Sequence, residues 1–217
     1  MPVAKIDRDD IHYSCSGQGE PVVMLLPHSS GPMGTEAFVD RLAEHFMVIR
    51  YDPLGAGRSS PAPTADAVTM RARAKEVLAV LDAAGIARAR LCCHSTGCGI
   101  GLAVVSAVPE RVDGLVLMSP WTHADGHLLV MQRLRIAVAR ALCPQDYERF
   151  NAALLFPPDY RRVHEPAFDR LAEAAAQQDA QQIENRLNAI LSFDARPILA
   201  SVACPALVVT AADDQLM

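Results

Sequence analysis

Residues 91–97 read Leu91-Cys92-Cys93-His94-Ser95-Thr96-Gly97, and they join an apolar strand pattern to a helical pattern that is rich in small residues. Cys93 and Gly97, two positions before and two after Ser95, are both small. A serine held in a strained strand-to-helix turn needs such neighbours. The helix N-terminus behind it would favour a developing oxyanion. Ser95 is therefore the candidate nucleophile; the alternative is a serine that only caps a helix after a buried strand.

Strand-like and helix-like segments alternate on both sides of this turn. The continuous apolar run Val22–Leu26 is typical of a buried parallel strand, and Val112–Met118 is a further strand-like segment. Helical patterns at Thr35–His45 and Val68–Ala84 lie between the strand-like segments. This alternation predicts an α/β fold with a mostly parallel sheet flanked by helices.

Composition narrows the class of protein. Apolar residues make up 51% of the 217 residues, which is enough for a buried core, and the net charge is −5 without a basic block. We therefore expect neither nucleic acid nor a membrane as a partner. The N-terminus lacks the pattern of a signal peptide, and the six cysteines have no secretory context, so we expect a reduced, cytoplasmic protein. The oligomeric state stays open, and a dimer is compatible with the sequence.

The alternation stops after Met118 and resumes near the C-terminus. Residues 119–202 have helical patterns and no convincing strand, which predicts a helical cap inserted into a core formed by residues 1–118 and 203–217. The expected cap helices are His127–Leu142, Gln145–Leu155, Ala167–Gln178 and Ala180–Leu191. The last strand, Ala206–Thr210, is expected to be an exposed sheet edge.

The segment around Ser95 resembles the nucleophile elbow of the α/β-hydrolase fold, G-x-S-x-G, with Cys93 in place of the first glycine. The segment Leu25-Leu26-Pro27-His28-Ser29-Ser30-Gly31 resembles the His-Gly-x-Gly loop of that family. The resemblance implies that the N–H groups of Ser29 and Thr96 form the oxyanion hole. His28 stands where glycine is usual, and it either faces the substrate or packs within the loop.

Two further segments resemble family loops. The segment from Asp52 to Ser59, Asp-Pro-Leu-Gly-Ala-Gly-Arg-Ser, is similar to D-x-R-G-x-G-x-S, with leucine in place of arginine, and implies a structural turn. The segment from Cys204 to Asp214 is similar to the strand and loop that carry the triad acid, which would be Asp214. An ordinary acidic turn is the alternative there, and Asp125 is the alternative acid.

No histidine stands at the position expected for the catalytic base, after the triad acid. The family order is serine, acid, histidine, yet all seven histidines precede Asp214. His94 adjoins the nucleophile, but its side chain is expected to point away from the serine. We expect the native chain to continue for roughly 40–60 residues, which is enough for a loop, a strand and a helix that would supply the histidine. The alternative is an inactive, ligand-binding protein with a hydrolase fold.

The expected cap resembles the aminoacrylate hydrolases of bacterial pyrimidine utilisation and the related 3-oxoadipate enol-lactonases. The similar segments are Ser119-Pro120-Trp121, Leu155–Tyr160 and Asn185–Ile190 with Phe193-Asp194. The resemblance implies a small, carboxylate-bearing substrate whose amide, carbamate, ester or enol-lactone bond is cleaved through an acyl-enzyme. It also implies Trp121 and Arg186 as substrate-binding residues. Any single cap arginine could instead lie on a solvated helix face.

Neither a cofactor nor a metal is expected. His123, Asp125 and His127 could together hold a metal ion, but their spacing is not that of a structural zinc site. A dehalogenase is disfavoured, because that chemistry needs a carboxylate at position 95.

Overall fold

A computed structural model describes residues 2–26, 35–175, 179–212 and 214–216. Two compact units are present. The first comprises Met1–His123 and Phe193–Ala211, and the second comprises Ala124–Ser192 and Ala212–Met217. The helical part of the second unit falls inside the predicted insert, whereas the last six residues group with it and not with the core.

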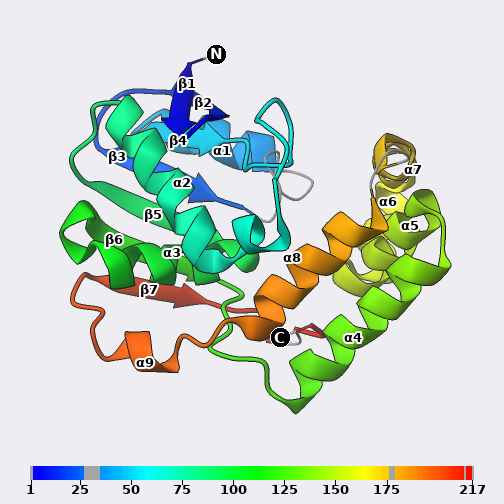
Figure 1. The fold of residues 1–217 in the computed structure, drawn as a ribbon. Helices are drawn as coiled ribbons and strands as arrows, with labels where there is room; N and C mark the ends of the chain where they lie inside the picture. The colour runs from blue at the N-terminus through cyan, green and yellow to red at the C-terminus, as the bar shows by residue number, and fades with distance from the viewer. Residues whose placement is uncertain (1, 27–34, 176–178, 213, 217) are drawn as a thin grey trace. The chain divides into compact units, whose positions relative to one another are not determined.

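The first unit is built on a seven-stranded sheet in the order β1-β2-β4-β3-β5-β6-β7 (Figure 1). The strands β3 to β7 are mutually parallel, and β1 and β2 are antiparallel additions at one edge. The predicted mostly parallel sheet is therefore confirmed. The strands are β1 (Val3–Ile6), β2 (Asp9–Ser16), β3 (Pro21–Leu25), β4 (Met47–Tyr51), β5 (Ala89–His94), β6 (Val112–Met118) and β7 (Ala206–Val209).

The central strands are mostly apolar because both faces of the sheet are covered, although Arg90 interrupts β5 and Asp113 interrupts β6. On one face, Val22, Met24 and Cys92 pack in a cluster with Val39 of α1 (Thr35–Ala43). The other face carries α2 (Met70–Ala83) and α3 (Thr96–Ala107), which lie side by side in front of the sheet in Figure 1. The short 3-10 turns η1 (Ala65–Val68) and η2 (Pro109–Arg111) precede α2 and β6.

Strand β7 forms the edge of the sheet beside β6, as expected from the sequence. Its four residues are all exposed, and Leu207 and Val208 are 57% and 56% exposed. The short helix α9 (Arg196–Leu199) precedes it in the same unit.

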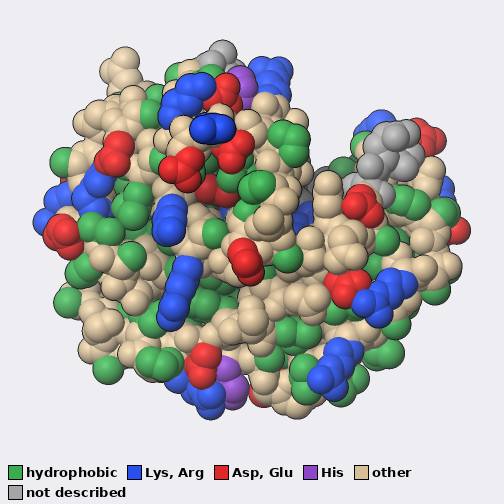
Figure 2. Space-filling model, in the orientation of Figure 1, with side chains coloured by type: hydrophobic (Ala, Val, Ile, Leu, Met, Phe, Trp, Pro, Cys, Tyr) green, Lys and Arg blue, Asp and Glu red, His purple; other side chains and the backbone are tan. Residues whose placement is uncertain are grey.

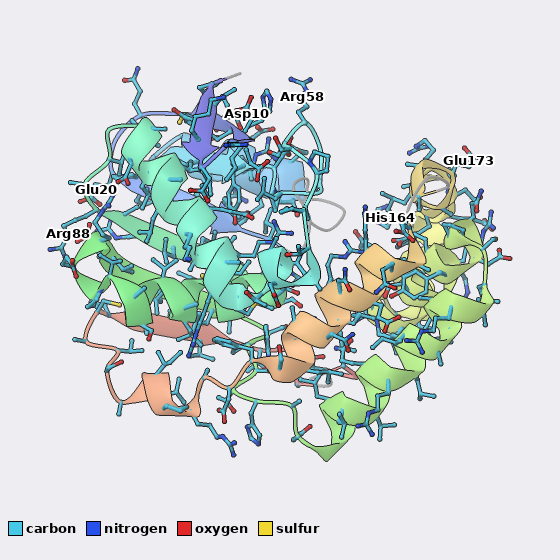
Figure 3. The ribbon with its side chains drawn as sticks, in the orientation of Figure 1. Asp10, Glu20, Arg58, Arg88, His164 and Glu173 are labelled. Carbon is cyan, nitrogen blue, oxygen red and sulfur yellow. The ribbon has the colours of Figure 1, made fainter. Side chains whose placement is uncertain are left out.

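The helices of the second unit follow the expected pattern, with α6 as an addition. They are α4 (Gly126–Ala141), α5 (Pro144–Leu155), α6 (Pro158–Val163), α7 (Glu165–Ala174) and α8 (Ala180–Ser192). Helix α4 packs on α8, and α5 packs on α7. An aromatic cluster joins α5 to α7, in which Tyr160 stacks on Phe156 and lies 4.2 Å, centroid to centroid, from the ring of His164, which is labelled in Figure 3.

Positive and negative side chains are interspersed over the visible face in Figure 2, where no large patch of one sign is seen. Within the described residues, no helix has the length and apolar character needed to cross a membrane.

Candidate active site

Ser95 sits in a strained backbone conformation between β5 and α3. Its φ of 50° and ψ of −119° are values that residues other than glycine rarely adopt. The turn is fixed on both sides: Ser95 N–H donates to the Met118 carbonyl at 2.9 Å, and Cys98 N–H donates to the Ser95 carbonyl at 2.8 Å. Such strain costs about 1–3 kcal/mol and persists where the surroundings impose it. The side chain of Ser95 is half-buried.

The small residues around Ser95 have specific packing reasons. A Cβ on Gly97 would lie 1.9 Å from the Leu25 carbonyl oxygen, so only glycine lets α3 approach the end of β3 this closely. At the other flank, Cys93 is fully buried, and its Sγ lies 2.6 Å from the position that a Cβ on Gly101 would occupy. Cysteine is accommodated in place of the usual glycine because residue 101 on α3 has no side chain.

The cysteines near the elbow are poor alternatives to Ser95 as nucleophile. Burial raises the pKa of Cys92 to about 11 and that of Cys98 to about 12, and it raises the pKa of Cys93 well above its ordinary value. Their thiols therefore stay protonated near neutral pH, whereas a reactive cysteine must form a thiolate.

Thr96 is the first residue of α3, directly after Ser95. The first N–H groups of a helix have no intrahelical partner, which is compatible with the predicted oxyanion role of the Thr96 N–H, and that role stays a prediction. The other predicted oxyanion residue, Ser29, lies outside the described residues, and so does His28.

The loop after β4 forms the tight turn that its glycines predicted. Gly55 and Gly57 have φ angles of 80° and 55°. A Cβ on Gly57 would lie 2.3 Å from the Asp52 carboxyl group, which instead accepts the Arg58 N–H at 2.9 Å. Arg58 marks this loop in Figure 3. Ser59 ties the loop to β2, because its Oγ accepts the His12 N–H at 2.9 Å.

A buried ion pair supports the same loop from α2. Arg73 donates to Glu76 at 2.7 Å and to the Leu54 carbonyl at 2.9 Å. Glu76 is 1% exposed, and burial raises its pKa to about 7 although Arg73 opposes the shift.

The two candidate acids differ in their surroundings. Asp214 belongs to the second unit, and its Oδ1 accepts the Leu216 N–H at 3.0 Å. Asp125 is the N-cap of α4, where its Oδ1 accepts the Leu128 N–H at 2.8 Å. The carboxylate of Asp125 thus has a local structural partner at the start of the helix.

His94 and His127 lie on different secondary-structure elements. His94 is the last residue of β5 and is half-buried. His127 lies on α4, and its Nε2 is 3.1 Å from the Gln215 carbonyl oxygen, one residue past Asp214. No group of three or more histidine, cysteine or acidic residues is arranged to hold a metal within the part of the chain that the structure describes.

The predicted substrate-binding residues lie in different units. Trp121 of the first unit is buried, packs edge-on against Phe193 and fills the space beside Gly99. Its indole Nε1 is buried without a hydrogen-bond partner among the described residues. Arg186 lies on α8 in the second unit and is half-buried, where it lowers the pKa of Glu148 on α5. The substrate-binding roles of both residues stay predictions.

Known proteins share both the sequence and the fold. A family model described as "alpha/beta hydrolase fold" matches residues 24–217. The "Putative carbamate hydrolase RutD" of Azorhizobium caulinodans is 32% identical over 222 residues, which cover 100% of this chain and 82% of that protein. The protein of the same name from Variovorax paradoxus is 30% identical and covers 95% of this chain and 79% of its own length.

Solved structures agree at the level of the fold. A hydrolase from Pseudomonas aeruginosa superimposes with a TM-score of 0.82 at 25% identity and covers 98% of this chain and 80% of its own. An enol-lactonase from Burkholderia xenovorans also has a TM-score of 0.82, at 23% identity, and covers 96% of this chain and 80% of its own. With the family model matching most of its length, this chain belongs to the α/β-hydrolase fold family.

Proposed function

We propose that the protein is a serine hydrolase that acts through an acyl-enzyme on a small, carboxylate-bearing substrate. The observation that carries the proposal is the strained conformation of Ser95 between β5 and α3. Strain of this kind is often found at functional residues. Asp7 and Ser119 also have positive φ, but among the described non-glycine residues with positive φ only Ser95 lies between the end of a strand and the first residue of a helix. The elbow also places Ser95 directly before the N–H groups of α3.

In the proposed reaction, Ser95 Oγ attacks the acyl carbon while a general base accepts the hydroxyl proton. The Thr96 N–H, together with that of Ser29, stabilises the oxyanion. The base then protonates the leaving group as the intermediate collapses to the acyl-enzyme. Water, activated by the same base, attacks the acyl-enzyme, releases the acid (a carboxylic acid from an amide or ester, a carbamic acid from a carbamate) and regenerates Ser95. Asp214 is the proposed acid that orients the imidazole base.

The substrate class is proposed from the relatives and from the cap. Relatives that are about 30% identical are named carbamate hydrolases, so a carbamate, amide or ester bond is the proposed target. Arg186 is the proposed partner of the substrate carboxylate, since an arginine can pair with it through two parallel hydrogen bonds. Trp121 is proposed as an apolar contact of the substrate.

Labelling with a fluorophosphonate tests the nucleophile. The full-length protein is treated with the probe, digested, and mapped by mass spectrometry. We expect one label per chain, on Ser95, and no label in the Ser95→Ala variant. The matched control is Ser106→Ala, an exposed serine near the end of α3, which should be labelled like the unaltered protein. A label on another residue, or no label on full-length protein, would contradict the proposal and favour a ligand-binding role.

A further inference from the structure

A second serine shares the unusual backbone conformation of Ser95. Among the described residues other than glycine, positive φ occurs at Asp7, Ser95 and Ser119, with values of 51°, 50° and 48°. Asp7 lies in the turn between β1 and β2, where aspartate tolerates such a conformation. Ser119 instead directly follows β6, the strand that pairs with β5. Strained serines therefore stand at the carboxyl ends of two neighbouring strands.

The register of the sheet places Ser119 beside Ser95. The last residues of β5 and β6, His94 and Met118, are paired, and the two serines are the residues that follow them. Ser95 N–H donates to the Met118 carbonyl at 2.9 Å, and Ser119 N–H donates to the Val209 carbonyl of β7 at 2.8 Å. All of these residues belong to the first unit, in which neighbouring strands lie about 4.8 Å apart.

The two side chains leave the sheet in nearly the same direction. Strands β5, β6 and β7 lie next to one another (Figure 1), so both serine N–H groups point the same way across the sheet. The peptide groups before the two serines are therefore parallel, apart from a twist of about 20–25° between strands. Because Cα is tetrahedral, φ fixes the direction of Cβ relative to that peptide group, and the two φ values are 50° and 48°. Both side chains are half-buried, so they face one partly accessible space beyond the strand ends.

The fold shows no structural use for the Ser119 hydroxyl group. Within the part of the chain that the structure describes, this hydroxyl group makes no hydrogen bond. Glycine would adopt the same φ without strain, whereas serine is strained there. Strain without a structural partner for the side chain is often found at functional residues.

The position of Ser119 relative to Ser95 indicates which reacting group it would meet. Strand β3 lies on one side of β5 and ends four residues before Ser29, the proposed oxyanion residue. Strand β6 lies on the other side and ends at Ser119. In acyl transfer, the leaving group departs away from the oxyanion, and the hydrolytic water later takes the place of the leaving group. Ser119 is therefore on the side where water is expected to attack.

We propose that Ser119 is a further catalytic residue, whose hydroxyl group hydrogen-bonds to the water that hydrolyses the acyl-enzyme. The general base accepts one proton of this water, and Ser119 Oγ accepts a hydrogen bond from the other O–H, which directs the water oxygen at the acyl carbon. When the bond to Ser95 breaks, the base returns the proton to Ser95 Oγ, and Ser119 neither gains nor loses a proton. The proposal rests on the proposed function, because the acyl group is carried by Ser95.

Carbamoylation of the full-length protein with p-nitrophenyl N,N-dimethylcarbamate separates the two half-reactions. Nitrophenolate leaves without a proton, so its release measures acylation, which needs no water. After removal of the reagent, intact-protein mass spectrometry follows the loss of the dimethylcarbamoyl group, which measures deacylation. We expect Ser119→Ala to slow deacylation about tenfold, the effect of one lost hydrogen bond, and to leave acylation within about twofold of the unaltered protein.

Ser119→Gly separates the hydroxyl group from the backbone strain. Alanine keeps Cβ and its strain, glycine relieves the strain, and neither has a hydroxyl group, so both variants should slow deacylation equally. The matched control is Ser106→Ala, an exposed serine of α3, which should behave like the unaltered protein, and thermal unfolding checks that each variant is folded.

Three outcomes would overturn the proposal: unchanged deacylation in Ser119→Ala, a slow deacylation in Ser119→Ala that Ser119→Gly restores, or equal slowing of acylation and deacylation. The last two would assign Ser119 to the shape of the backbone. If Ser95 of the unaltered protein is not carbamoylated, the proposed function fails and the role of Ser119 fails with it, which is a different result from a change confined to the Ser119 variants.

Discussion

The strain at Ser95 predicts an inversion of the usual stability order of glycine and alanine. Alanine at position 95 must keep φ at 50°, whereas glycine adopts this value without a Cβ penalty. Relief of the strain is worth about 1–3 kcal/mol, and the extra unfolded-state entropy of glycine costs about 0.5–1 kcal/mol. Ser95→Gly should therefore be more stable than Ser95→Ala by roughly 1 kcal/mol, or about 2–4 °C in Tm for a chain of this size.

Urea unfolding monitored by circular dichroism measures this difference. Both variants lack the hydroxyl group, so the comparison isolates the backbone from the chemistry of the side chain. The control pair is Ser106→Gly and Ser106→Ala in the last turn of α3, where the order should be normal and glycine should be less stable by about 0.5–1 kcal/mol. If Ser95→Ala proves as stable as Ser95→Gly, or more stable, the elbow is not strained and the reasoning fails.

Three further predictions concern the packing around the elbow and its supporting loop. Gly101→Ala by itself should destabilise the protein, and the same substitution should destabilise the Cys93→Ala variant much less. In a double-mutant cycle measured by urea unfolding, we expect a favourable coupling energy of about 1–3 kcal/mol between the two substitutions. If the two effects add within about 0.5 kcal/mol, the Cys93 Sγ does not limit the space at residue 101. Because the pKa of Glu76 is raised from 4.5 to about 7 in the folded state, its ionisation should lower the unfolding free energy as the pH rises from 5 to 8, by about 2–3 kcal/mol. Glu76→Gln should remove this dependence, and an unchanged pH profile would contradict it. Asp52→Ala should lower the free energy of unfolding by about 1–2 kcal/mol, because the hydrogen bond from the Arg58 N–H is lost. The same urea unfolding assay measures this change. A decrease of less than about 0.3 kcal/mol, which is within the additivity error, would show that the carboxylate does not hold the loop.

The elbow and the parallel strands could be predicted from the sequence because the residues that define each of them are neighbours in the chain. The apolar run of β5, the small residues and the helical pattern that follows all lie between residues 89 and 107. The tolerance for Cys93 could only be explained by packing, since the residue that makes room for it is Gly101 on α3. The antiparallel strands β1 and β2 were missed, although Ile11 and Tyr13 alternate with more polar residues in the manner of a half-buried strand.

The burial of two polar residues in the second unit could not be predicted from the sequence. Gln132 and Asn151 are residue types that are usually found on exposed helix faces, and nothing in the spacing indicates that both are buried. Their burial depends on how α4 and α5 pack, which is a tertiary property. The contact between His127 and the Gln215 carbonyl has the same origin, because it joins residues 88 positions apart.

Ser95 is proposed to form the covalent intermediate, and a slowly hydrolysed carbamate should trap that intermediate. Full-length protein is mixed with p-nitrophenyl N-methylcarbamate, quenched in acid, and digested with trypsin for fragment-ion mass spectrometry. We expect one methylcarbamoyl group per chain on Ser95 and the release of one equivalent of nitrophenol, and we expect neither in Ser95→Ala. A carbamoyl group on another residue, or nitrophenol released equally by Ser95→Ala, would contradict it.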